Sequence, residues 1–326
     1  MIKFALFASL FFSSLCFADA NAERPNLDDP KVLKRTIEEA VELIGLEAAD
    51  ETIQICEREG MKPYTGSGWG VFRHPDGEVK ALQQFRDGKQ HGLATFFHEN
   101  GSKEGEFFYL NDKINGLEKT WYSNGQIRDK TMRVNGQLDG ISQNWYENGQ
   151  KKYEANWKDG KIEGLLTKWH ENGQKESEAN FKDGKLGGLA TTWHENGQKK
   201  SEGNYKGGKN EGLVTNWYEN GQKERESKYM DGIQIGLQTQ WYENGEKSAE
   251  VTFKNGLPYN GKKWLPNGEV CPDSSLTNGT GVMVKYENSG EEFKRIFLEN
   301  GKIVKESVAI PEPDFQETRL PAVFPE

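Results

Sequence analysis

The chain has few of the residues from which a compact domain builds its core. Of its 326 residues, 34% are A, V, I, L, M, F, W, Y or C, and the mean hydropathy is −0.86. A two-layer domain of this length needs more apolar side-chain volume to fill its interior at native density. The sequence therefore predicts a fold without a thick core.

Cysteine is also scarce, and the spacings that bind metals are missing. The three cysteines are Cys16, Cys56 and Cys271, and neither C-x-x-C nor H-x-x-x-H occurs anywhere. A metal centre is therefore not expected, and no other cofactor motif is present. Cys56 and Cys271 flank the repeats described below. We expect them to be free or to pair with other chains, although a disulfide between the two is conceivable.

The chain has no surplus of basic charge. Its 51 acidic and 42 basic residues give a net charge of −9. Nucleic-acid affinity depends mainly on basic side chains that release counterions, so a nucleic-acid partner is not expected.

The first twenty residues differ in kind from the rest. Lys3 precedes an apolar run from Phe4 to Phe17, and small residues follow at Ala18 and Ala20. This pattern predicts a cleavable secretory signal, and the run is short for a membrane span. We expect an exported protein, periplasmic or at the cell surface, with no integral membrane anchor after cleavage.

What the chain has in abundance is a repeat. Its 9 Trp, 11 Tyr and 17 Phe argue against disorder, and many of them recur with a fixed period of 24 residues. The repeated phrase is Trp-Tyr/His-Glu-Asn-Gly, with two further glycine columns in phase. The tryptophans of this phrase are Trp121, Trp145, Trp169, Trp193, Trp217 and Trp241.

Each repeat reads as two strands and two turns. Proline replaces the first loop residue at Pro75-Asp76-Gly77, and glycine is constant at the third, which predicts a three-residue loop with a left-handed glycine. We expect the Lys182-Asp183-Gly184 type of turn to be the same. Thr167 then lies opposite Ser177. The Trp169 column shares one apolar face with the column of Tyr153 and Trp157, and Lys, Glu and Asn occupy the other face.

The predicted fold is all-β: an elongated single-layer antiparallel array of β-hairpins with a short N-terminal helix as its cap. The helix begins near Asp29, includes Val41 and Ile44, and stops at Gly45. A strand between Glu47 and Lys62 would close the first edge. The predicted segments are a signal peptide (1–20), a helical cap segment (21–62), the repeat array (63–270), and degenerate terminal hairpins with a proline-containing tail (271–326).

The phrase W-[YH]-E-N-G-Q, followed by K-x-x-E-x-x-[YFW]-x-D-G-K and a further G-L, resembles the MORN-repeat variant of bacteria, the YwqK-type antitoxin family. The resemblance covers about residues 63–270. It implies an extended β-hairpin array that binds proteins and has no catalytic residues of its own. The antitoxin label implies capture of a toxin.

No catalytic residue is predicted from the chemistry either. His74, His98, His170 and His194 occupy one repeat column, where tyrosine substitutes for them, and members of successive repeats lie about 10 Å apart, too far to share a metal ion. The glutamates recur beside lysines, as cross-strand ion pairs do.

We therefore expect a non-enzymatic scaffold that binds another protein through the six tryptophans named above. A cell-wall or polysaccharide binder is the alternative, because aromatics on hairpins also stack on sugars. An antitoxin or immunity-type binder is a special case of protein binding. The tryptophan column alternates with Thr and Leu rather than with hydrogen-bonding side chains, which favours a protein partner.

Overall fold

The computed structural model describes residues 26–47, 53–57, 64–287 and 290–308, with backbone alone for 44–47 and 53–57. The predicted signal segment, the tail beyond residue 308 and the side chain of Cys56 lie outside the described residues. The chain forms two compact units, Met1–Gly125 and Gln126–Glu326.

The first unit combines one helix with β-hairpins. Strands β3 to β6 pair antiparallel in chain order, and β6 also pairs with β8. β1 pairs antiparallel with β2, which lies in the segment predicted as an edge strand, and makes a short parallel pairing with β3. The described elements are α1 (Pro30–Glu39), β1 (Val41–Glu47), β2 (Ile53–Glu57), β3 (Gly68–Arg73), β4 (Val79–Arg86), β5 (Lys89–Phe97), β6 (Lys103–Leu110), β7 (Lys113–Ile114) and β8 (Gly116–Trp121).

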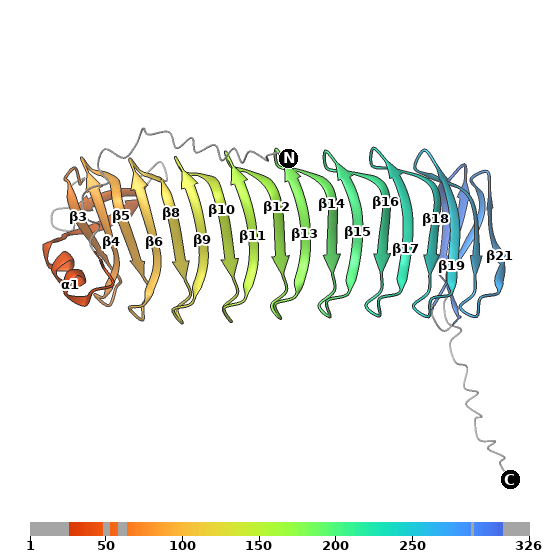
Figure 1. Ribbon diagram of the computed structural model, residues 1–326, viewed down its shortest axis with the longest axis horizontal. Coiled ribbons are helices and arrows are strands. Elements are labelled where there is room, and N and C mark those ends of the chain that lie inside the picture. The colour runs from red at the N-terminus through yellow and green to blue at the C-terminus, as the bar shows by residue number, and fades with distance from the viewer. Residues whose placement is uncertain (1–25, 48–52, 58–63, 288–289, 309–326) are drawn as a thin grey trace, which may run out of the picture. The chain divides into compact units, whose positions relative to one another are not determined.

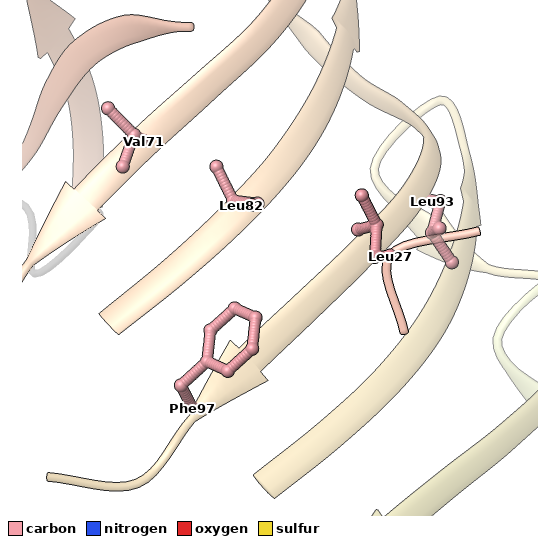
Figure 2. Close-up of a cluster of buried hydrophobic side chains, with 5 residues drawn as sticks. All are labelled: Leu27, Val71, Leu82, Leu93 and Phe97. Carbon is pink, nitrogen blue, oxygen red and sulfur yellow. The ribbon is translucent and has the colours of Figure 1, made fainter. Parts of the chain in front are cut away.

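Helix α1 covers the strands of the first unit and supplies the apolar core there. Its residues Val32, Leu33 and Ile37 pack against a cluster of buried side chains in which Val71 and Leu82 are both 0% exposed. The helix acts as the cap that the sequence predicts, since it removes one face of β3 and β4 from water. Figure 2 shows the cluster: Leu27, Val71, Leu82, Leu93 and Phe97.

Helix α1 is shorter than predicted. It begins as expected, with the Asp29 carboxylate accepting a hydrogen bond from the backbone N–H of Lys31 at 2.8 Å. The prediction that Val41 and Ile44 are helical is wrong, because both lie in β1. β-Branched residues are stiff at χ1 and suit a pleated strand, and here pairing with β2 and β3 decides in favour of the strand.

The second unit is an antiparallel meander. Each strand pairs with the strands before and after it in the chain, and β9 to β17 lie side by side in one layer in Figure 1. The same pairing continues from β17 to β24. The predicted all-β array of antiparallel hairpins is thereby confirmed.

The strands of the second unit are seven to nine residues long. Their bounds are β9 (Ile127–Val134), β10 (Gln137–Trp145), β11 (Lys151–Lys158), β12 (Lys161–Trp169), β13 (Lys175–Lys182), β14 (Lys185–Trp193), β15 (Lys199–Lys206), β16 (Lys209–Trp217), β17 (Lys223–Met230), β18 (Ile233–Trp241), β19 (Lys247–Lys254), β20 (Leu257–Trp264), β21 (Val270–Thr277), β22 (Thr280–Tyr286), β23 (Glu292–Glu299) and β24 (Lys302–Val308).

The Glu-Asn-Gly turns are the three-residue loops that the sequence predicts. The His170 N–H donates to the Gln174 carbonyl at 2.8 Å, and the Gly173 N–H donates to the His170 carbonyl at 2.9 Å. Gly173 has φ = 84°, the left-handed conformation in which glycine carries no Cβ penalty.

The Lys-Asp-Gly turns are a different kind, and their prediction as three-residue loops is wrong. Lys182 pairs directly with Lys185, so only Asp183 and Gly184 form the loop. Both have positive φ, at 51° and 75°, which defines a two-residue type I′ turn.

In the second unit, a β-bulge beside each of the five predicted tryptophans reverses the predicted faces. Thr167, predicted opposite Ser177, instead lies opposite Glu178. The cause is one extra residue in β13. Trp169 pairs with Lys175 and Lys168 pairs with Ser177, so Glu176 between them has no partner on β12. Because side chains alternate with a period of two, a shift of one residue exchanges the faces of a strand.

Two aromatic columns predicted to share a face therefore lie on opposite faces. We call the side that carries Trp169, Thr167 and Leu165, with the equivalent residues of the other repeats, the ladder face. Their directly opposed partners on β13 are Lys175, Glu178 and Asn180. The opposite face carries the second aromatic column, whose members lie directly across from the glycines of the G-L phrases: Trp157–Gly140, Phe181–Gly164, Tyr205–Gly188, Tyr229–Gly212 and Phe253–Gly236.

Candidate protein-binding face

Five of the six predicted tryptophans form the first of three rows on the ladder face of the second unit. Trp121 ends β8 in the first unit, and the other five end alternate strands of the second unit. All six side chains are half-buried. Within the second unit, successive tryptophans of the row are two strands apart, about 9.6 Å. The five in the second unit are Trp145 (β10), Trp169 (β12), Trp193 (β14), Trp217 (β16) and Trp241 (β18).

Lysines lie over at least five of the six rings, which the sequence analysis did not foresee. The Nζ atom lies 5.3–5.7 Å from the ring centroid, within the range of a cation–π contact. The tryptophan row therefore offers a partner less open ring surface than predicted. The pairs are Lys103–Trp121, Lys151–Trp169, Lys175–Trp193, Lys199–Trp217 and Lys223–Trp241.

The same lysines each form an ion pair with the glutamate three residues later, at 2.5–3.2 Å. The bulge makes this possible, because it brings positions i and i+3 of the strand onto one face. In one repeat, hydrogen bonds from Lys151 and Gln143 hold the pKa of Glu154 below its usual range. Beside the tryptophans, the ladder face therefore has both signs of charge, already paired.

The second row alternates threonine and glutamate, directly opposed across successive strands. Thr167 is 6% exposed and Thr191 is 7% exposed, so this row is the closely packed middle of the face. Its members run Glu154, Thr167, Glu178, Thr191, Glu202, Thr215, Glu226, Thr239 and Glu250.

The third row, which we call the Leu–Asn row, is the exposed one. Its aliphatic residues recur every 24 residues and are 44–53% exposed. Each lies directly opposite a polar residue across a hairpin. The sequence does contain a sign of these polar partners, because asparagine recurs at 156, 180 and 204. The pairs are Ile141–Asn156, Leu165–Asn180, Leu189–Asn204, Leu213–Lys228 and Leu237–Thr252.

The Tyr/His column joins neighbouring repeats. The Tyr218 hydroxyl donates to the Trp241 carbonyl at 2.8 Å, and His194 Nε2 lies 2.9 Å from the Trp217 carbonyl. Both rings direct a polar hydrogen at the backbone carbonyl of the tryptophan in the next repeat. This shared hydrogen bond explains why tyrosine and histidine substitute for each other. Since the carbonyl accepts, Nε2 of each such histidine carries the proton.

We expect Tyr218→Phe to lower the free energy of unfolding by about 1 kcal/mol, because it removes this hydrogen bond and leaves the carbonyl without it. Tyr218→His is the matched control and should cost less, since histidine fills this column elsewhere. Urea unfolding measures both. Equal losses for the two variants would contradict the assignment.

The loop asparagines hold both their own turn and the next repeat. Asn196 Oδ1 accepts from the Gln198 N–H at 3.0 Å, and Asn196 Nδ2 donates to the Glu219 carbonyl at 2.6 Å. The equivalent asparagines of the second unit, at 148, 172, 220 and 244, repeat both bonds. Asparagine is thus required by two partners, not only by turn propensity.

Asn196→Ala should lower the free energy of unfolding by about 1–2 kcal/mol, since two exposed hydrogen bonds are lost. Asn204→Ala is the control, because Asn204 is exposed and has no hydrogen bond from its side chain in the described part of the chain. Hydrogen exchange of the 195–199 and 219–223 backbone amides should rise only for Asn196→Ala.

The described residues contain no group of three or more His, Cys, Asp or Glu side chains arranged to hold a metal ion. Nor does any described helix have the length and apolar composition needed to cross a bilayer.

A buried lysine lies near the C-terminal end of the second unit. Lys263 is 8% exposed, and the Cys271 thiol beside it lies 3.0 Å from the Tyr286 hydroxyl. Burial, together with the nearby Lys285 ammonium, lowers the pKa of Lys263 to about 8. The folded state thus binds the Lys263 proton less tightly than the unfolded state does.

We expect Lys263→Met to stabilise the protein at pH 7 by about 1–3 kcal/mol, because it removes a buried cation and keeps the apolar stem. Below pH 8 Lys263 is protonated in both states and its burial cost is complete. Above pH 8 the folded state releases the proton first, so the wild type gains stability until about pH 10.5. Thermal unfolding from pH 7 to 10.5 should show the advantage of the variant shrinking. A constant difference would refute the assignment.

Comparison with known proteins identifies the repeat. Seven stretches match the model described as MORN repeat variant: residues 90–111, 114–135, 138–159, 162–183, 186–206, 210–231 and 234–255. Seven repeats of the chain thus match this model, and the resemblance read from the Trp-Tyr/His-Glu-Asn-Gly phrase is confirmed to that extent.

No match was found among curated proteins. Among solved structures, one match is to a chain of "Crystal Structure of TcdB2-TccC3-Cdc42", at 10% sequence identity and a TM-score of 0.17. It covers 77% of this chain and 17% of that chain. Nothing about function follows from a likeness this weak.

Proposed function

We propose that the protein is a non-enzymatic repeat scaffold that binds another protein along the ladder face of its second unit. The observation that carries this is the regular row of exposed Ile141, Leu165, Leu189, Leu213 and Leu237, one on every second strand. Exposed aliphatic side chains are ordinary when scattered singly. Five of them at one fixed spacing on one face, alternating with polar residues, form a repeated surface that suits a partner.

In the first unit, helix α1 covers the equivalent face of the sheet. Val71 and Leu82, which occupy the columns of Thr167 and Glu178, are buried beneath α1. Among the described residues of the second unit, no equivalent helix covers the Leu–Asn row. A partner protein would there take the place that α1 takes in the first unit.

The tryptophans contribute to this binding at the margin of the face. Their rings are half-buried, and a partner that approaches them also meets the lysines that lie over the rings. This arrangement disfavours the polysaccharide alternative, because sugar stacking needs an open aromatic face. An antitoxin or immunity-type binder remains a special case of the same proposal.

Site-specific photo-crosslinking tests the face. A photoreactive phenylalanine derivative replaces Leu189 on the ladder face or, as the matched control, Lys168, which is exposed on the opposite face. We expect one protein to be crosslinked from position 189 and not from position 168, in extracts of the cell envelope. Crosslinks from both positions alike, or sedimentation with purified cell wall and no crosslinked protein, would overturn the proposal.

Export is the second part of the proposal and rests on the pattern from Lys3 to Ala20. Fractionation followed by N-terminal sequencing tests it. The expected result is a chain in the periplasmic or extracellular fraction that begins after Ala20 or Ala22. An intact N-terminus in the cytoplasm would refute export and would leave the binding face unaffected.

A further inference from the structure

The Leu–Asn row repeats with a spacing that matches one kind of polypeptide. Its members recur every two strands, about 9.6 Å apart. A polyproline-II helix has three residues per turn and rises 3.1 Å per residue, so every third side chain returns to the same side after about 9.3 Å. Over the four intervals from Ile141 to Leu237 the two spacings diverge by only about 1.2 Å.

Other backbone conformations fit less well. An extended strand returns a side chain to the same side every 6.6–6.8 Å, and its third residue faces away. An α-helix approximates the spacing at seven residues, about 10.5 Å, and drifts by nearly 4 Å over the same four intervals. Its carbonyls are also already bonded within the helix.

The polar members of the row supply what a polyproline-II helix needs. Such a helix has no internal hydrogen bonds, so its carbonyls need donors when a surface covers them. Asn156, Asn180 and Asn204 are exposed, and their side chains make no hydrogen bond among the described residues. Each lies directly opposite an aliphatic residue, so a donor accompanies an apolar contact in each of these three repeats.

The charges of the ladder face also favour an uncharged ligand. The lysines that lie over the tryptophan rings and the glutamates of the second row are already paired with each other, and Lys228 is the charged member of the Leu–Asn row. A ligand with its own charges would have to break these pairs or lose solvation. An uncharged segment has neither cost.

We propose that the Leu–Asn row binds a polyproline-II segment of a partner protein, with a branched aliphatic residue such as leucine at every third position and one turn on each repeat. This proposal rests on the proposed function and specifies its partner. About 13 residues span the row from Ile141 to Leu237 at 3.1 Å per residue.

The test uses the full chain and a fluorescent peptide of five Leu-Pro-Pro triplets, flanked by lysines for solubility. The control peptide has the same composition with its leucines grouped together. Fluorescence polarisation should show binding of the triplet peptide only. Replacing Leu189 and Leu213 by asparagine should weaken it about tenfold or more. Ile303→Asn with Val304→Asn, at comparably exposed positions on β24, should leave it unchanged.

A second variant distinguishes binding that needs the amide donors from binding to any apolar surface. Changing Asn180 and Asn204 to leucine enlarges the apolar surface and removes two amide donors. The proposal expects weaker binding of the triplet peptide, whereas a plain hydrophobic patch would bind it more tightly. Circular dichroism checks that each variant keeps its β-structure.

The outcomes distinguish this inference from the proposed function. Equal binding of the two peptides, or tighter binding by the Asn→Leu variant, overturns the polyproline-II assignment. If no peptide binds while the photoreactive residue at position 189 still captures a protein, the scaffold stands and its partner has another conformation. If position 189 captures nothing and no peptide binds, both proposals fail.

Discussion

Leu82→Ala is expected to lower the free energy of unfolding of the first unit by about 3 kcal/mol. Leu82 is 0% exposed and lies in the cluster that α1 covers (Figure 2). Truncation removes its buried methyl groups and leaves a cavity that helix and sheet fill only in part. The helix should then detach more readily, because its apolar residues have few other contacts.

The matched control is the same substitution in the open row. Leu189→Ala removes an equal number of atoms, but Leu189 is 48% exposed, so the loss should stay below about 1 kcal/mol. Hydrogen-exchange mass spectrometry in urea separates the two units. Faster exchange is expected in α1 and β3 to β5 for Leu82→Ala alone. Equal losses would mean that the first unit has no distinct core.

Gly281→Ala is expected to cost about 3–5 kcal/mol in the second unit. Gly281 has φ = 147°, and a Cβ there would lie 2.2 Å from the Ser275 carbonyl oxygen and 3.1 Å from Leu276 Cα. These are backbone atoms of the paired strand β21, and Leu276 is the direct partner of Gly281. The overlap can be relieved only by opening the ladder between β21 and β22.

Gly160→Ala separates conformational strain from this overlap. Gly160 also has positive φ, at 75°, but a methyl group at this position would meet no heavy atom within 4 Å, so only the left-handed penalty of about 1 kcal/mol applies. Urea midpoints of the two variants should differ accordingly. A Gly281→Ala protein as stable as Gly160→Ala would contradict the tight approach of β21 to β22.

Much of the fold follows from the period and the turn residues. The 24-residue spacing, the Glu-Asn-Gly loops and the alternation of apolar and polar residues predict the hairpins, because each is a local property of a few neighbouring residues. The Asp29 cap of α1 is equally local. The site is less predictable: the sequence marks the tryptophan columns but not the lysines that lie over the rings, which come from the preceding hairpin.

By itself, then, the sequence determined the all-β class, the repeat length, the N-terminal cap and the placement of the turns. Tertiary structure alone decided the faces. One extra residue, Glu176 and its equivalents, shifts the register between strands, and it lies where the chain shows no unusual residue type. Whether a bulge forms depends on the pairing of both strands together. That shift places the glutamates and asparagines on the same face of the sheet as the tryptophans and the exposed leucines, and so it creates the proposed binding face.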